Sequence, residues 1–307
     1  MNLIEGPLLK ACSPKINWRR AVRANAIGLL GVTLLLGQSP RDQLAEADRL
    51  ADQGNWSKAR PIYASAEAKF HRIGDRGGEL HAKLGRLHGD VEAGSYRDTR
   101  EEVVRILAEP EAQNNPDIKI RALALMGNID LNLNTAAAEL DWRAVRDAAT
   151  AAGDQRWQNR ANGELGLVAG LNGNLGASAL ALFQAITRAE ALGDVSSEVY
   201  FATWLANGMS VNGMADTALQ IVDKATELAK KSGYSELPFH LTIAKIRALL
   251  SLPDSQREPG RQDARVLLTT ALEDARNNGV HGAQTELLMP SGETQTRPMR
   301  DTLKTGR

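Results

Sequence analysis

The side chains that could carry out chemistry are few and widely spaced in this sequence. Its five histidines are His71, His81, His88, His240 and His281. His81 and His88 are seven residues apart, so a helix would place them on one face, with Asp90 nearby. A metal site needs more ligands than two spread histidines supply, so we interpret the histidines as structural or solvated side chains. The sequence therefore predicts no metal site.

No catalytic motif stands out either. The sequence contains none of the patterns HExxH, GxSxG, GxGxxG or Walker A. Adjacent carboxylates such as Glu101 and Glu102 point in different directions on a helix, which is typical of a solvated face. Cys12 is the single cysteine, which excludes an intrachain disulfide and a zinc site built on several thiolates. We therefore expect neither an enzyme nor a bound cofactor.

Composition narrows the classes of function further. The chain has 307 residues, with 37 Lys+Arg against 37 Asp+Glu, and this zero net charge disfavours a general nucleic-acid binder. A hydrophobic content of 43% with 24% charged residues excludes wholesale disorder. Aromatic residues make up only 4% and alanine is abundant, which favours closely packed helices over a sheet. The composition predicts an all-α protein.

The first 38 residues differ in character from the rest. They contain five basic residues and only Glu5 as an acid, a net charge of +4, which leaves −4 for the remainder. The apolar run Ala26–Gly37 has 12 residues, the length of a signal-peptide core and short of the ~20 that span a bilayer. We interpret residues 1–41 as a signal peptide or short N-terminal anchor with a linker, and expect an exported or periplasmic protein. The alternative is a cytoplasmic protein with an apolar first helix.

One small residue recurs through the rest of the chain at a nearly constant spacing. It occupies Ala59, Thr99, Ala138, Ser178, Ala218 and Ala264, at separations of 40, 39, 40, 40 and 46. Four residues later stands a bulky apolar residue, namely Tyr63, Val103, Trp142, Leu182, Val222 or Leu268. Seven residues later stands a small or aliphatic residue, namely Ala66, Ile106, Val145, Ala185, Ala225 or Ala271. Positions i, i+4 and i+7 share one helix face, so the spacing predicts a repeated helix that packs closely against a neighbour.

Glycines at two further offsets mark the ends of these helices. Fifteen residues after each small residue stand Gly74, Asn114, Gly153, Gly193, Gly233 and Gly279. Five residues before it stand Gly54, Gly94, Leu133, Gly173, Gly213 and Pro259. Glycine is favoured just past a helix, where the backbone takes a positive φ. Each unit is therefore predicted to be helix A, tight turn, helix B, tight turn, and the sequence predicts six such hairpins.

The spacing also predicts where the units begin and end. In the fourth unit we expect helix A at about Trp157–Asn172 and helix B at about Leu175–Leu192. Two prolines and a glycine place the extra residues of the last unit in a lengthened loop at Leu252–Gly260. No linker interrupts the pattern, so we predict one continuous solenoid over residues 42–288. Residues 289–307 are polar and aperiodic, which predicts a disordered tail or the remnant of a longer protein.

This pattern resembles the tetratricopeptide repeat (TPR) family over about residues 43–288. The residues of the best-matching unit at the family's positions are Leu165, Gly166, Gly173, Ser178, Leu182 and Ala185. The period of ~40 exceeds the usual ~34 and falls in the range of HEAT repeats, but glycine before helix B favours the TPR resemblance. Extended repeats of this kind are similar to those of bacterial signalling proteins and of CHAT-domain proteins. The resemblance implies a right-handed superhelical solenoid of antiparallel helix-turn-helix repeats.

The resemblance also implies a ligand surface, the concave groove lined mostly by A helices. Aligned to the family, the residues expected on or beside this groove are Arg160, Glu164, Tyr200, Thr203, Trp204 and Asn207. Asn207 occupies a position that family members use to hold a peptide backbone or carboxylate. The basic residues of the subclass that binds chaperone tails are missing beside it, so we do not expect such a tail as ligand. Trp204 also fits packing between helices, and Trp56 and Trp142 are interpreted as structural.

The sequence therefore favours a non-catalytic scaffold that binds a protein or peptide segment in the concave groove. The alternative is a ligand-sensing regulatory module of a bacterial signalling or CHAT-type protein that lacks its effector domain. A third hypothesis is an enzyme subunit or an assembly chaperone. We expect no nucleic-acid partner, and contact with a membrane only through an N-terminal anchor.

Overall fold

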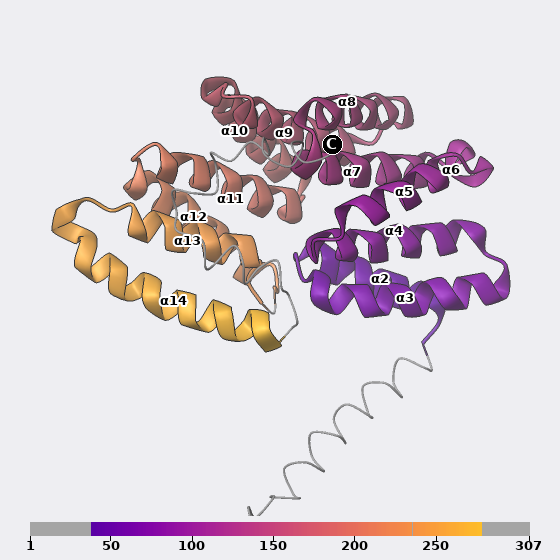
Figure 1. Ribbon diagram of the computed structural model, residues 1–307, viewed down its shortest axis with the longest axis horizontal. Coiled ribbons are helices and arrows are strands. Elements are labelled where there is room, and N and C mark those ends of the chain that lie inside the picture. The colour runs from indigo at the N-terminus through magenta and orange to yellow at the C-terminus, as the bar shows by residue number, and fades with distance from the viewer. Residues whose placement is uncertain (1–37, 235, 278–307) are drawn as a thin grey trace, which may run out of the picture. The chain divides into compact units, whose positions relative to one another are not determined.

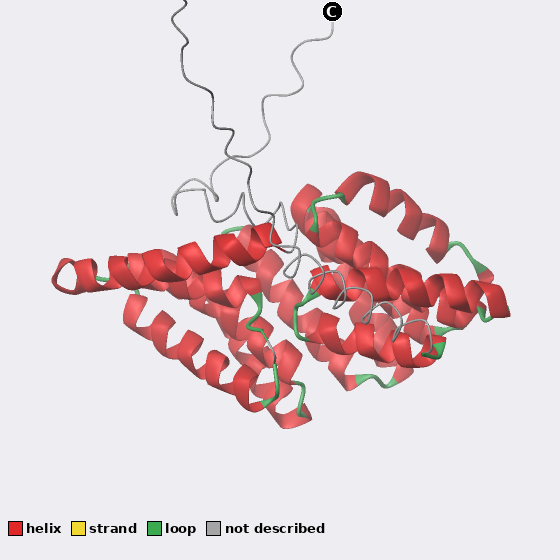
Figure 2. Ribbon diagram, turned by 90° about the horizontal axis from the view of Figure 1, so that it is seen from below, coloured by secondary structure: helices red, strands yellow, loops and turns green. Residues whose placement is uncertain are grey.

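The computed structural model describes residues 38–234 and 236–277 of the chain. Within these ranges it contains thirteen α-helices, one short 3-10 helix and no strand, which confirms the all-α prediction (Figures 1 and 2). No helix in the same ranges has both the length and the apolar character needed to cross a bilayer. Residues 1–37 of the predicted leader, the predicted tail and Gly279 lie outside the described residues. The helices from Pro40 onward belong to one compact unit.

The helices follow one another with short connections. In chain order they are α2 (Pro40–Asp52), α3 (Trp56–Ile73), α4 (Arg76–Glu92), α5 (Tyr96–Leu107), α6 (Pro110–Asn114), α7 (Pro116–Leu133), α8 (Thr135–Ala152), α9 (Gln155–Leu171), α10 (Leu175–Leu192), α11 (Val195–Val211), α12 (Ala215–Lys231), α13 (Phe239–Leu250), the 3-10 helix η1 (Asp254–Gln256) and α14 (Arg257–Asn277). The observed α9 and α10 match the helices A and B expected for the fourth unit to within two residues.

These helices form six hairpins that pack side by side. The hairpins are α2–α3, α4–α5, α7–α8, α9–α10, α11–α12 and α13–α14, and the short α6 lies between the second and the third. Each hairpin contacts the next along the chain, so the observed architecture is the helical-repeat solenoid that the spacing predicts (Figure 1).

The recurring small residues are points of close contact between helices. All six of them are buried, with Ser178 the most exposed at 9%. The bulky residues four positions later fill the space beside them, and Trp142 is only 1% exposed. Removing this apolar surface from water supplies most of the stability of the hairpins.

The predicted turn glycines have the expected backbone conformation. Gly54, Gly74, Gly94, Gly153, Gly173, Gly193, Gly213 and Gly233 all have positive φ, between 61° and 94°. At Gly74 this conformation lets the backbone N–H bond back to the carbonyl of His71 and close the end of α3. The turns are therefore determined locally, by residues next to each helix.

Two predicted boundaries are wrong. Asn114 does not end a long helix B, because α5 stops at Leu107 and Pro110 begins the separate helix α6. The loop at Leu252–Gly260 is shorter than expected, because η1 occupies part of it and α14 begins at Arg257. Pro259 lies in the first turn of α14. Backbone N–H groups in a first turn have no acceptor within the helix, so the N–H that proline lacks costs no helical hydrogen bond. The long connection in the sixth unit instead precedes α13, at residues 232–238.

Candidate functional site

The inner side of the solenoid encloses one large cavity. Its volume is about 3150 Å³, and residues from all six hairpins line it. Every tryptophan and tyrosine within the described residues lies on its wall, namely Trp56, Trp142, Trp157, Trp204, Tyr63, Tyr96, Tyr200 and Tyr234. Trp142 and Tyr63 are almost fully buried, so they expose little surface to the cavity. Since only 4% of the chain is aromatic, this concentration makes the cavity the candidate binding site.

Five of the six residues expected on the groove line this cavity. They are Arg160, Tyr200, Thr203, Trp204 and Asn207. Glu164 is the exception and requires a correction, because its side chain is fully buried (0% exposed) beneath the wall. It contributes an internal ion pair and presents no surface to a ligand.

Arg160, Glu164 and Tyr200 form a cluster on α9 and α11, in which Glu164 is fully buried. The Arg160 Nε donates to Glu164 Oε1 at 2.9 Å, and the guanidinium carbon lies 3.7 Å from the centre of the Tyr200 ring. Burial raises the pKa of Glu164, and the positive charge of Arg160 opposes this rise. Burial, followed by the charge of Glu164, raises the pKa of the Tyr200 hydroxyl. Arg160 therefore holds the tyrosine ring in place on the cavity wall.

The next pair along the wall joins α11 to α13. Asn207 is 9% exposed, and its Oδ1 accepts a hydrogen bond from Arg247 Nη1 at 3.4 Å. A basic residue, Arg247, therefore stands beside Asn207 on the cavity wall. The two residues are 40 positions apart, so adding one repeat period to Asn207 would have found Arg247. Thr203 uses its hydroxyl within α11, where Oγ1 donates to the carbonyl of Val199 at 2.8 Å.

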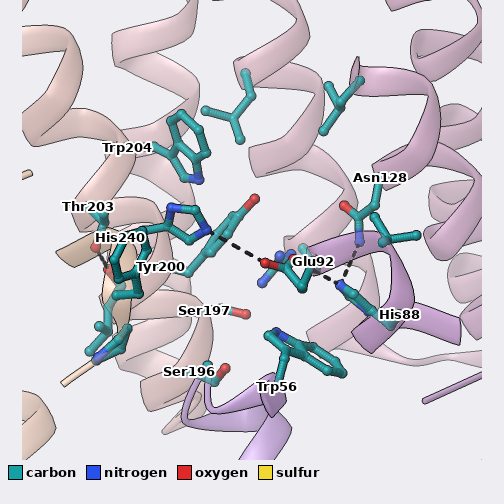
Figure 3. Close-up of a pocket in the computed structure, with 18 of the residues that line it drawn as sticks. Trp56, His88, Glu92, Asn128, Ser196, Ser197, Tyr200, Thr203, Trp204 and His240 are labelled. Atoms are coloured by element: carbon teal, nitrogen blue, oxygen red, sulfur yellow. Dashed lines mark hydrogen bonds and ion pairs between the residues drawn. The ribbon is translucent and has the colours of Figure 1, made fainter. Parts of the chain in front are cut away.

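Figure 3 shows a group of one carboxylate and two histidines in the cavity that sequence analysis did not identify. The carboxylate of Glu92, at the end of α4, lies 3.7 Å from His88 Nε2 and 3.7 Å from His240 Nε2, on either side of it. Although burial opposes the change, the facing side chains of His240 and His88 hold the pKa of Glu92 well below its usual range. The carboxylate is therefore ionised at neutral pH.

Aromatic rings cover both histidines of this group. Trp56 stacks on His88 with ring centres 3.9 Å apart, and Trp204 stacks on His240 at 6.3 Å. Asn128 lies beside the same ring nitrogen of His88 that faces Glu92, with its Nδ2 3.5 Å from His88 Nε2 (Figure 3). Trp56 therefore has a place on the ligand surface as well as its predicted structural role. His88 and Asn128 are again 40 residues apart, the signal of two successive repeats.

The groups on this wall are aromatic rings, amides and charged side chains. Within the described residues, no group of three or more His, Cys, Asp or Glu side chains could hold a metal ion. Stacked rings, amides and paired charges on a wide wall provide apolar contacts and hydrogen bonds to a passing chain.

Comparison with known proteins supports the fold. No protein-family model matches the sequence, and no curated protein does. Among solved structures, the chain is similar to a Rap protein crystallised in complex with competence and sporulation factor, with a TM-score of 0.57. The match covers 80% of this chain and 71% of the Rap chain, at 13% sequence identity. At that identity the similarity shows the architecture alone, a TPR-like arrangement of helical repeats.

Proposed function

We propose that this protein is a non-catalytic scaffold that binds an extended segment of a protein or peptide in its central cavity. The observation that carries the proposal is the gathering of all described tryptophans and tyrosines on that one wall. The Rap protein of similar architecture is complexed with competence and sporulation factor, so such a solenoid can accommodate a bound factor. The TPR resemblance supports the same function.

The size of the cavity favours a chain segment over a small molecule. Its volume of about 3150 Å³ exceeds the ~300–1,000 Å³ of typical small-molecule pockets. The wall alternates apolar and polar groups along the solenoid, from Trp56 and Asn128 to Trp204 and Asn207. The rings provide contact area for side chains, while the amides can exchange hydrogen bonds with a peptide backbone.

Peptide selection tests this function directly. Dodecapeptides displayed in a random library are selected on the purified protein, and the best binder is labelled and titrated against it. We expect the change Trp204→Ala to weaken binding at least tenfold, because a ring at the centre of a binding surface is a typical hot spot. Asn207→Ala is expected to weaken it about fivefold through the loss of one hydrogen bond.

Matched controls on the outer surface distinguish a local effect from unfolding. Phe183 is 62% exposed and Asn162 is exposed, and neither lines the cavity. Phe183→Ala and Asn162→Ala should bind the selected peptide like the unmodified protein. Binding that survives both cavity changes, or a library with no binder, would contradict the proposed function. Arg160→Ala is avoided, because it would leave Glu164 buried without its partner.

A second candidate is a sensing module whose bound segment changes the arrangement of the hairpins. The observation that favours it is the hydrogen bond between Asn55, at the turn from α2 to α3, and Glu236, just before α13, because such a contact between distant hairpins can form or break when a segment binds. A change in scattering radius when the selected peptide binds would distinguish this module from a static scaffold.

We also propose that residues 1–41 direct export, on the basis of the +4 charge and the apolar run Ala26–Gly37. Mass spectrometry of the mature N-terminus tests this. An intact Met1 in the cytosolic fraction would refute cleavage of a signal.

A further inference from the structure

The first two hairpins meet the start of the sixth across the solenoid, at a set of contacts that we call the seam. It consists of the contacts of Tyr234, Glu236, Pro238 and His240 with Asp52, Gly54, Asn55, Lys58 and Glu92. The hydrogen-bonded partners are 178 to 182 residues apart in sequence. Figure 1 shows the start of α13 beside the ends of α2 and α4. The seam therefore joins the solenoid into a ring.

The contacts of the seam are mostly polar. Asn55 Nδ2 donates to Glu236 Oε2 at 3.0 Å, and the Lys58 ammonium pairs with the other oxygen of Glu236. The Tyr234 hydroxyl donates to the carbonyl of Asp52 at 3.2 Å. An apolar contact is made by the Pro238 ring against Gly54, where a Cβ on the glycine would lie 3.3 Å from the Pro238 Cβ.

The seam is the weakest interface of the ring. Its ion pairs are solvated, since the side chains of Lys58 and Glu236 are 44% and 51% exposed, and such pairs contribute little to stability. Neighbouring hairpins instead share buried apolar clusters, for example around Leu125 and Ile129 or around Val222 and Leu241. Because a repeat contacts mainly its neighbours, separating the seam leaves every one of these clusters intact.

The seam also crosses the candidate binding surface. Glu92 and His240 both line the cavity, and their side chains face each other there (Figure 3). A segment bound between Asn207 and Asn128 would occupy the same cavity as this pair. Separation of the pair would widen the way into the cavity.

We propose that the seam is a reversible gate of the cavity, which opens to admit the bound segment and closes over it. The role in ligand exchange rests on the proposed function, whereas the opening itself does not. A closed seam slows both entry and escape, because both require the same separation of the first and sixth hairpins.

The opening is tested without any ligand by measuring a distance across the seam. Spin labels are placed at Arg72→Cys and Arg265→Cys, both exposed, in a Cys12→Ser background of the full chain. We expect double electron–electron resonance to show two populations, one with a short distance between the two labels and one with a long distance. Glu236→Lys, which faces Lys58 with a like charge, should raise the long-distance fraction about threefold, and Lys58→Glu in the same chain should restore it. A single distance, unchanged in all three proteins, would overturn the gate.

The effect on exchange is tested by locking the seam. The changes Gly54→Cys and Pro238→Cys, in the Cys12→Ser background, place two Cβ atoms near the separation that a disulfide requires. The reduced form of the same protein is the matched control, so strain at Gly54 is common to both forms. Stopped-flow mixing with the fluorescein-labelled dodecapeptide selected above should show association and dissociation at least tenfold slower in the oxidised form.

The outcomes separate the two proposals. Equal exchange rates in the oxidised and reduced forms would overturn the gate while leaving the binding function intact. Absence of peptide binding in both forms would contradict the proposed function, and the spin-label distances would still decide whether the seam opens.

Discussion

Single residues in this protein act through partners one repeat away. Arg160 lies over Tyr200, Asn207 accepts from Arg247, and His88 lies beside Asn128, each pair 40 positions apart. A side chain on an A helix is therefore positioned by the equivalent side chain of the next hairpin. Glu164 is held differently, by Arg160 four residues away on its own helix.

A carboxylate pair within the third hairpin is tied to the second hairpin by Arg100. Asp130 on α7 is 2% exposed and receives Arg100 Nε and Nη2 at 2.9 and 3.1 Å. Burial, followed by a hydrogen bond with Asp130, raises the pKa of Asp141 on α8 to about 7. The Asp141 carboxyl is therefore partly protonated at neutral pH, and its ionisation places two negative charges side by side.

The change Asp141→Asn should stabilise the protein at alkaline pH. Between about pH 4 and 7 the folded state holds a proton that the unfolded state has lost, so stability falls as the pH rises, and it levels off above pH 7. Asparagine does not titrate, so the variant does not lose stability in this way as the pH rises. We expect a gain of about 1–2 kcal/mol at pH 8, after a discount for solvent screening, and little gain at pH 5.

Urea unfolding at the two pH values measures the effect. Asp147→Asn, on the exposed side of the same helix, is the matched control and should change stability little at either pH. An equal gain from Asp141→Asn at pH 5 and pH 8 would show that Asp141 does not titrate in this range.

At the scale of the helix, glycine has two distinct uses in this protein. At the turns it supplies positive φ, whereas inside α7 Gly127 supplies room. A Cβ at Gly127 would lie 2.7 Å from the indole of Trp142, which is only 1% exposed, so the ring would have to shift. The close contact of helix A with helix B in the third hairpin therefore depends on the absence of a side chain.

The change Gly127→Ala should lower the free energy of unfolding by about 1–2 kcal/mol. Alanine favours the helix by ~1 kcal/mol, but overpacking a rigid core costs about 1–3 kcal/mol, so the clash outweighs the propensity. Gly208→Ala in α11 should instead be neutral or stabilising, since nothing lies within 4 Å of its added Cβ. Thermal unfolding of both variants decides this, and shifts of the same sign would contradict the argument.

At the scale of the whole molecule, stability is a sum over neighbouring hairpins, with the seam as an additional and weaker contact. We expect hydrogen exchange to be slowest in α7 and α9, which have a hairpin on either side. It should be fastest in α2, α14 and the residues before α13, where opening of the seam exposes the backbone. Uniform protection in all hairpins would show that the ring opens only as a unit.

The period of about 40, the small anchor residues and the turn glycines together predict the solenoid. All eight described glycines at the predicted offsets have positive φ, because a turn depends on residues that adjoin in sequence. Five of the six expected groove residues lie on the cavity, because a repeat carries its inner face at a constant offset. The exceptions are local too, since Pro110 alone divides the expected second helix B.

Only the tertiary structure decides how the ends of the array meet. The pairing of Glu92 with His240 and of Asn55 with Glu236 depends on a small rotation at each hairpin, accumulated over several repeats. No local pattern encodes that sum, since side-chain packing at every interface contributes to it. The sequence by itself therefore determined the repeat and its inner face. The closure of that face into a ring, and with it the group of Glu92, His88 and His240 in the cavity, was decided by the packing of all six hairpins together.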